Sequence, residues 1–425
     1  MFRNSVWRSL GWITCFAFLI CAPPKATAVV LQTDPPVANP ASNVQISARA
    51  ADLGFDVKKL KSIDRKLSAL VEEGKVFGCS ALIFRKGEEV YFGAWGNRNQ
   101  RKEIPVERDT IFRIFSMTKP VTSVAAMQLV EQGKLDINAP VSDYLPDFEN
   151  LKVLEARNGS TVKVDPKRTM KVLDLLRHTS GLSYGFFGRT PVDKQYLRAG
   201  VLMTDLNLSS TVSKLGKIPL LYHPGTQFHY SASTDVLGRV VEVVSDSTFE
   251  QYLNQNLFGP LGMEDTFFSV PESKQDRLSK LYSPNSKGNL VVASPLHSLR
   301  FESRGSEFYS GGGGLCSTVD DYMKFCKMLL NGGELGGNQF LKPATIKQMF
   351  SNQLGQIERP SRKFKFGLGF RVFPQGDFGW GGMAGTRFFV HPKKEVAVIF
   401  MMQITPSGRR KYSEIVRDAA YAALR

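Results

Sequence analysis

A serine and a lysine three residues apart are the first residues in this sequence that could do chemistry together. They are Ser116 and Lys119 of the stretch FSMTKPVTSVAAMQLVEQG. The apolar residues after them recur with a helical period, and Pro120 is tolerated only in about the first turn of a helix. Residues i and i+3 share one helix face, so we expect the hydroxyl and the amine to lie together at a helix N-terminus, where free N–H groups favour negative charge.

Two further stretches supply groups that would complete such a site. HPGTQFHYSASTDVLGRVVE presents Tyr230 in a loop before a helix, and FGWGGMAGTRFFV presents Trp380, Gly381 and Gly382 entering a strand. A serine hydroxyl is a poor nucleophile until a neighbouring base takes its proton. The lysine, held neutral by burial and by the positive helix end, is one candidate for that base. The tyrosine is the other if the fold brings it beside the lysine, and the sequence does not decide between them.

The elements that must position these residues fall into three blocks. Residues 57–76 have the pattern of an amphipathic helix, and the strand-like runs CSALIFRKG and EEVYFGAWG follow it. From Ser116 to about Pro295 the pattern is mainly helical, and the last third returns to strands and one closing helix. This order predicts an α+β fold: an antiparallel sheet flanked by the N- and C-terminal helices, with the site between two lobes. We expect a sheet lobe at about 52–112 and 296–425, and a mainly helical lobe at about 113–295.

Together these motifs resemble the serine β-lactamase and penicillin-binding-protein superfamily, which has Ser-x-x-Lys, then Tyr-x-Asn, then Lys-Thr-Gly. Within it the chain is similar to class C β-lactamases and family VIII carboxylesterases over nearly all of residues 52–425. The segments LLRHTSGL, PVSDYLPDF, PLGMEDT and GGGGLCSTVDDYMKFCKMLLNGG add to the likeness. The resemblance implies an acyl-enzyme mechanism without a metal or cofactor. It makes Ser116 the nucleophile, Lys119 its activating partner, Tyr230 the general base, the backbone N–H groups of Ser116 and Met383 the oxyanion hole, and Trp380, Gly381, Gly382 and Ala232 substrate contacts.

Two departures from the family pattern bear on the substrate. The asparagine of the second motif is replaced by Ala232 and the lysine of the third by Trp380, so two groups that hold the amide and the carboxylate of β-lactams and D-Ala-D-Ala peptides are missing. Tryptophan in WGG resembles the family VIII esterases, and an alcohol leaves more easily than an amine, so we expect a small or short-chain carboxylic ester. Arg387, expected on the same strand, could receive a carboxylate, which keeps open a β-lactamase, D,D-carboxypeptidase or D-aminopeptidase acting on a cell-wall-derived substrate.

Another stretch imitates a different hydrolase motif. GLSYG, residues 181–185, matches the G-x-S-x-G elbow, which needs a strand before it and a helix after it. A helical pattern precedes it here, so Ser183 is predicted to be structural and His178 to order a loop. The alternative from another class is a non-catalytic protein that binds cell-wall peptides. Such a protein has no need of a nucleophile and two bases together.

Residues 1–28 have the pattern of a secretory signal peptide. A basic start precedes an apolar stretch at about residues 10–22, and a small-residue site ends at Ala28. The apolar run is shorter than the ~20 residues of a membrane span, so we expect an exported, periplasmic or secreted chain without a transmembrane segment. A lipoprotein anchored through Cys21 is the alternative. Residues 29–51 are interpreted as a polar, Pro-rich lead-in.

The charge and the cysteines exclude other classes of function. The formal net charge is +16, three units of which belong to the predicted signal peptide. Because we expect an exported chain and find no RNA-binding motif or DNA-recognition helix, we expect no nucleic-acid partner. The basic surface should face anionic polymers. No histidine falls in a zinc-ligand pattern, so no metal is expected. Two of the five cysteines belong to the predicted signal peptide. The other three, Cys79, Cys316 and Cys326, are predicted to be buried, and a Cys316–Cys326 disulfide is possible after export. Nothing indicates the oligomeric state.

Overall fold

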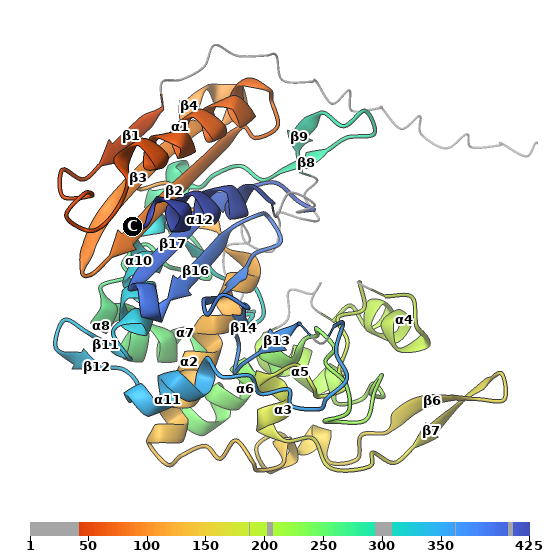
Figure 1. The fold of residues 1–425 in the computed structure, drawn as a ribbon. Helices are drawn as coiled ribbons and strands as arrows, with labels where there is room; N and C mark the ends of the chain where they lie inside the picture. The colour runs from red at the N-terminus through yellow and green to blue at the C-terminus, as the bar shows by residue number, and fades with distance from the viewer. Residues whose placement is uncertain (1–41, 187, 202–206, 294–307, 362, 407–410) are drawn as a thin grey trace, which may run out of the picture. The chain divides into compact units, whose positions relative to one another are not determined.

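The computed structural model describes residues 42–425 except 187, 202–206, 294–307, 362 and 407–410 (Figure 1). These residues belong to one compact unit, Asp34–Arg425. The predicted signal peptide and most of the predicted lead-in lie outside the described residues. Among the helices of the described part, none combines the length and the apolar character needed to cross a membrane.

A nine-stranded antiparallel sheet is built from two distant parts of the chain, drawn in orange and blue in Figure 1. The strands follow the order β1-β3-β2-β17-β16-β15-β14-β13, with β4 attached to β3. β2 and β17 pair in the middle, with Ile83 opposite Val398. The prediction of one discontinuous sheet is therefore confirmed. The strand bounds are β1 Asn43–Ile46, β2 Gly78–Arg85, β3 Glu88–Asn99, β4 Ile104–Pro105, β13 Lys365–Phe366, β14 Arg371–Val372, β15 Phe378–Gly381, β16 Arg387–His391 and β17 Val396–Met402.

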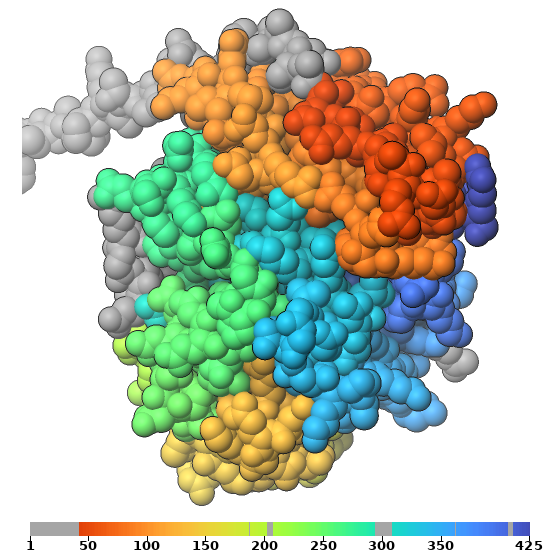
Figure 2. All heavy atoms as spheres, turned by 90° about the vertical axis from the view of Figure 1, so that its left-hand side faces the viewer, coloured from red at the N-terminus to blue at the C-terminus, as the bar shows by residue number. Residues whose placement is uncertain are grey.

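The centre of this sheet is buried on both faces, which is why β2 and β17 are nearly continuous apolar runs. One face packs on α1 (Val57–Glu72) and α12 (Lys411–Ala423), as predicted, and α10 (Val319–Leu330) packs on β2, β16 and β17. α1 begins at Asp56, whose carboxylate accepts two backbone N–H groups of the first turn. In the space-filling view, cyan atoms of the region that includes α10 lie between the orange strands and the green helices (Figure 2).

The helical part is organised around α2 (Thr118–Glu131) and α6 (Ser233–Ser245), which pack against each other. α2 is buried nearly all round, as a helix at the centre of a core must be. The two short hairpins β6–β7 and β8–β9 interrupt the region predicted to be mainly helical. The other bounds are α3 Val172–Leu176, α4 Pro191–Arg198, α5 Leu208–Leu215, α7 Phe249–Leu253, α8 Gly259–Leu261, α11 Pro343–Met349, β5 Phe112–Arg113, β6 Val153–Arg157, β7 Ser160–Val164, β8 Tyr282–Pro284, β9 Leu290–Val292, β10 Cys316–Ser317, β11 Glu334–Leu335 and β12 Asn338–Gln339.

The structure corrects one expectation and decides one alternative that the sequence left open. β1 lies within the segment interpreted as a lead-in, and Ala50 after it is fully buried, so the fold begins at least nine residues before position 52. β1 pairs with β3 and turns Val44 and Ile46 toward the core. The polar residues around these two hide this strand in the sequence. The cysteines of the described residues, Cys79, Cys316 and Cys326, are buried, as predicted. Cys316 and Cys326 pack in separate apolar clusters, so the disulfide that the sequence allowed is not formed.

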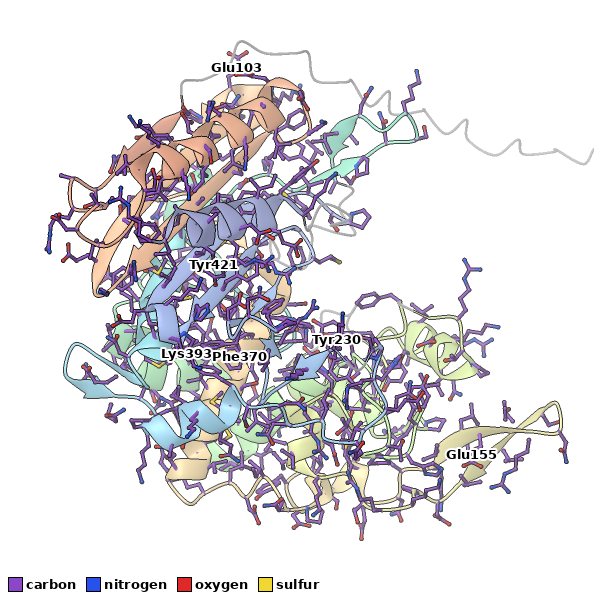
Figure 3. All side chains as sticks on the ribbon, viewed as in Figure 1. Glu103, Glu155, Tyr230, Phe370, Lys393 and Tyr421 are labelled. Carbon is purple, nitrogen blue, oxygen red and sulfur yellow. The ribbon has the colours of Figure 1, made fainter. Side chains whose placement is uncertain are left out.

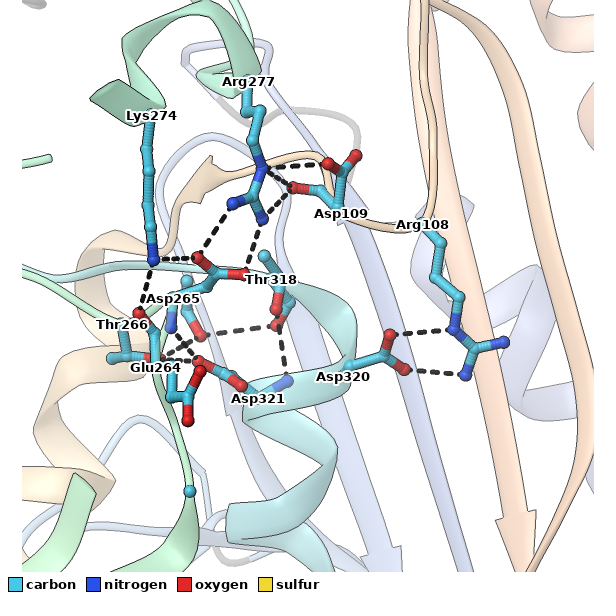
Figure 4. Close-up of polar contacts among 12 residues, drawn as sticks. Arg108, Asp109, Glu264, Asp265, Thr266, Lys274, Arg277, Thr318, Asp320 and Asp321 are labelled. Carbon is cyan, nitrogen blue, oxygen red and sulfur yellow. Dashed lines mark hydrogen bonds and ion pairs between the residues drawn. The ribbon is translucent and has the colours of Figure 1, made fainter. Parts of the chain in front are cut away.

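A network of polar contacts fixes the segment that leads into β5 (Figure 4). The Asp321 carboxylate of α10 accepts the backbone N–H of Asp265 at 2.6 Å and the hydroxyl of Thr266 at 3.1 Å. Asp265 in turn pairs with Arg277, whose carbonyl accepts the N–H of Ile111. β5, which follows Ile111, also pairs with β10. These contacts hold the chain in place immediately before the turn at Phe115.

Candidate active site

Ser116 lies in a 3₁₀ turn, η2 (Phe115–Met117), that continues directly into α2. Lys119 therefore follows one turn later and Pro120 lies in the first turn of α2, as predicted. Ser116 is half-buried, whereas Lys119 is 1% exposed. Phe115 has φ of 44°, in the left-handed region that bulky residues rarely adopt. Backbone strain of this kind persists only where the surroundings enforce it, and it is concentrated at functional sites.

The amine of Lys119 is surrounded by hydrogen-bond acceptors. Its Nζ donates to the Tyr184 hydroxyl at 2.8 Å and to the Gly312 carbonyl at 2.5 Å, and lies 3.4 Å from Ser116 Oγ. Nζ also lies 4.7 Å from the ring centroid of Tyr230 and 5.1 Å from that of Tyr184. Three oxygen atoms therefore lie around Nζ, so this buried amine has hydrogen-bond partners without a carboxylate among the described residues.

Tyr230, which is labelled in Figure 3, lies in the loop before α6, as predicted. Aromatic rings surround it. The indole N–H of Trp380 donates to the Tyr230 hydroxyl at 3.3 Å. The ring of His178 is 4.7 Å from that of Tyr230, centroid to centroid, and the ring of Tyr184 is 5.5 Å away. Ala232, two residues on, is fully buried and offers no polar side chain. The site therefore gathers a hydroxyl, an amine, two phenols and an indole.

The turn after β15 lies against the residues that precede Ser116. Gly382 donates its N–H to the Thr386 carbonyl at 2.7 Å, and the Thr386 hydroxyl donates to the Ile114 carbonyl at 3.2 Å. A Cβ on Gly382 would come within 2.3 Å of the Ile114 oxygen, so only glycine fits there. Met383 belongs to the same small apolar cluster as Phe115. The two backbone segments proposed for an oxyanion hole, at Ser116 and Met383, are thus brought together.

Arg387 lies on the other side of the sheet from this site. It begins β16, the strand after the one that carries Trp380, and pairs with Gly381. Phe388, opposite Trp380, faces the main core, whereas Arg387 and Phe389 face the side of α1 and α12. The Arg387 guanidinium lies 5.2 Å from the centre of the Phe389 ring. The expectation that Arg387 lies on the strand of Trp380 is therefore wrong: the residue is on the next strand, and its position in the register faces away from Trp380.

The GLSYG stretch contains a structural serine and a site tyrosine. Ser183 is 2% exposed and donates to Asp193 Oδ1 at 2.5 Å, and Asp193 also closes the capping box of α4. The position agrees with the structural role predicted for Ser183. Tyr184, the next residue, was not predicted, although it contacts Lys119 directly. No spacing relative to Ser116 marks it, and its only signal in the sequence is that it follows the family-like segment LLRHTSGL.

His178 is a buried neutral ring beneath Tyr230. Its Nδ1 lies 3.4 Å from the Ser231 hydroxyl, which begins a chain of hydroxyls through Ser233 to Ser180 with steps of 2.7 Å. Burial, and then the nearby charge of Lys119, lower the pKa of His178 well below its usual 6.5. The imidazole is therefore uncharged at neutral pH. It orders the loop, as predicted, and also supports the ring of Tyr230.

The residues that the structure describes include no group of three or more His, Cys, Asp or Glu side chains placed to hold a metal ion. The chemistry available comes instead from a half-buried hydroxyl beside an amine, two phenols and backbone N–H groups. A hydroxyl activated in this way, at a helix start that favours negative charge, is suited to acyl transfer through a covalent intermediate.

The fold and the site define a serine hydrolase of the class that includes β-lactamases and penicillin-binding proteins. The chain belongs to the Beta-lactamase family, whose model matches residues 63–423. It is 31% identical over 360 residues to Protein Rv1367c of Mycobacterium tuberculosis, covering 79% of this chain and 88% of that one. It is 26% identical over 390 residues to Esterase EstB of Burkholderia gladioli, covering 85% and 94%. The solved structure of EstCE1, a hydrolase with promiscuous acyltransferase activity, is similar with a TM-score of 0.71 at 28% identity, covering 88% and 100%.

Proposed function

We propose that this serine hydrolase cleaves carboxylic esters by acylating Ser116 and releasing the acyl group to water. The observation that carries the proposal is the contact of Trp380 with Tyr230, at the position where the family's third motif has a lysine. An indole keeps a hydrogen-bond donor there and removes a positive charge. An ester without a carboxylate has no need of that charge.

In the acylation step, Ser116 Oγ attacks the ester carbonyl and its proton passes to Lys119 or Tyr230. A neutral amine has two N–H groups, which is enough for the Gly312 carbonyl and the Tyr184 hydroxyl, and leaves a lone pair for the proton of Ser116 at 3.4 Å. The backbone N–H groups of Ser116 and Met383 would stabilise the oxyanion. The alcohol then leaves with the proton, which the same path delivers.

In the deacylation step, water replaces the alcohol and attacks the acyl-enzyme. Tyr230 is suited to take the proton of that water, because its hydroxyl already accepts a hydrogen bond from Trp380 and Lys119 Nζ lies over its ring. The ester then yields a carboxylic acid and regenerated Ser116.

The loss of the family's amide at one position and of its cation at another supports an ester substrate over a β-lactam or a peptide. Ala232 is buried and Trp380 is uncharged, and Arg387 faces away. Each polar substrate group left unpaired in a buried site costs about 1–3 kcal/mol, and a carboxylate costs more. The similarity to EstB, an esterase, agrees with this substrate class. β-Lactamase, D,D-carboxypeptidase and D-aminopeptidase activities are the alternatives.

Fluorophosphonate labelling and a pair of substrates test the proposal. Ser116→Ala should abolish labelling as measured by intact mass, while wild type gains one adduct on the peptide that contains Ser116. We expect kcat/KM for p-nitrophenyl butyrate to exceed that for a chromogenic cephalosporin, measured on the same preparation. If the cephalosporin is the better substrate, the esterase proposal gives way to the β-lactamase alternative.

A further inference from the structure

A continuous series of aromatic rings passes the proposed catalytic residues. Consecutive ring centroids are 5.0, 5.5, 5.5, 5.3 and 6.3 Å apart, so each ring is in contact range of the next. We call this series the aromatic arc. In order, its members are Phe186, Tyr184, Tyr230, Trp380, Phe366 and Phe364.

The rings of the arc are not buried equally. Phe366 is fully buried and Tyr184 is 8% exposed, whereas Tyr230 and Trp380 are half-buried. Phe186 is 50% exposed, one of four large apolar side chains with such exposure in the described part of the chain. Phe186 packs on Tyr184 and extends the apolar surface of the arc to solvent, where an apolar ligand would bury further surface by covering it.

The two ends of the arc differ in chemistry. At the Phe364 end, the guanidinium of Arg371 lies 5.4 Å from the ring centre. At the other end, Phe186 packs against Tyr184, which is hydrogen-bonded to Lys119. Lys119 Nζ is in turn 3.4 Å from Ser116 Oγ. A group attached to Ser116 therefore starts beside the middle of the arc and meets an apolar ring toward Phe186.

We propose that Tyr184 and Phe186 form a subsite for an elongated apolar acyl group, so that the preferred substrates are esters of medium-chain or aryl carboxylic acids. This inference rests on the proposed esterase function and refines its substrate. The acyl group stays bonded to Ser116 through both chemical steps, whereas the alcohol leaves after the first. A surface beside Ser116 that assists both steps must therefore contact the acyl group.

A chain-length series tests the subsite. Wild type should show a ratio of kcat/KM for p-nitrophenyl octanoate to that for the acetate of about ten or more, since each added methylene in an apolar site strengthens binding. Phe186→Ala should lower that ratio about fivefold, and Phe186→Leu should keep most of it. Val292→Ala is the matched control, because Val292 is 49% exposed on β9 and should leave the ratio unchanged.

Two results would overturn the subsite. One is a Phe186→Ala ratio equal to that of wild type. The other is a loss of kcat/KM in Phe186→Ala that depends on the alcohol part of the ester instead of the acyl part, seen when 1-naphthyl acetate is compared with p-nitrophenyl acetate. Fluorophosphonate labelling of Ser116 and hydrolysis of p-nitrophenyl acetate are measured alongside. If labelling and hydrolysis are absent in wild type, the proposed function fails; if both are present and the wild-type ratio is flat, only the subsite fails.

Discussion

Removing the hydroxyl of Tyr184 should disturb the amine that stands beside Ser116. In Tyr184→Phe, Lys119 Nζ loses its acceptor at 2.8 Å and keeps the Gly312 carbonyl at 2.5 Å. Lys119 is 1% exposed, so water has little access to replace the lost acceptor. A buried donor left without its acceptor costs about 1–3 kcal/mol, which corresponds to about 5- to 150-fold in rate if the hydrogen bond is needed in the transition state.

The assay is kcat/KM on p-nitrophenyl acetate, together with urea unfolding. We expect kcat/KM of Tyr184→Phe to fall by that factor while the protein stays folded. Tyr144→Phe is the matched control, since the Tyr144 hydroxyl accepts an exposed N–H, that of Asp136, at 3.1 Å and is not in contact with Lys119. A Tyr184→Phe variant with wild-type kcat/KM would refute the reasoning that this phenol holds Nζ in place.

Three further predictions concern residues of the site and its support. Lys119→Ala and Tyr230→Phe should each lose most esterase activity, and the double variant should be little worse than either; independent, multiplicative losses would contradict a shared proton path. Because burial holds the pKa of His178 below its usual 6.5, only the unfolded chain gains this proton as the pH falls below 6.5, and the free energy of unfolding should drop by up to about 1.36 kcal/mol per pH unit. Urea unfolding of His178→Asn at several pH values should show a smaller dependence of this free energy on pH. Ser183→Ala removes the hydrogen bond to Asp193, so it should cost about 1–3 kcal/mol of stability and leave fluorophosphonate labelling intact; loss of labelling would contradict its structural role.

The sequence was informative where a feature depends on neighbouring residues. Ser116 and Lys119 are related by one helical turn, and Pro120 limits where that helix begins, so their proximity follows from local geometry. The apolar runs of β2 and β17 likewise predict central strands, because both faces of these strands are buried. These parts of the fold needed no knowledge of distant contacts.

The remaining features depend on how distant segments meet. The face on which Arg387 lies is set by the length of the turn between β15 and β16, which fixes which residues of β16 lie opposite β15. Tyr184 reaches Lys119 only because its loop packs beside α2 and Tyr230. β1 is four residues long and its alternate positions are exposed, so the sequence carries no strong hydrophobic pattern for a strand that pairs with β3. None of these relations can be read from local periodicity.

The pairing of β2 with β17 has a consequence for how the protein acquires its structure. β2 and β3 can form a hairpin early in synthesis, but the inner edge of β2 receives its partner only after residue 402 has been made. Until then, the edge of a strand whose central residues all end up buried stays open, and such open edges invite pairing with other chains. We expect folding to be slow, as for other sheets joined by distant segments, and the newly made chain to depend on protection from aggregation while it waits.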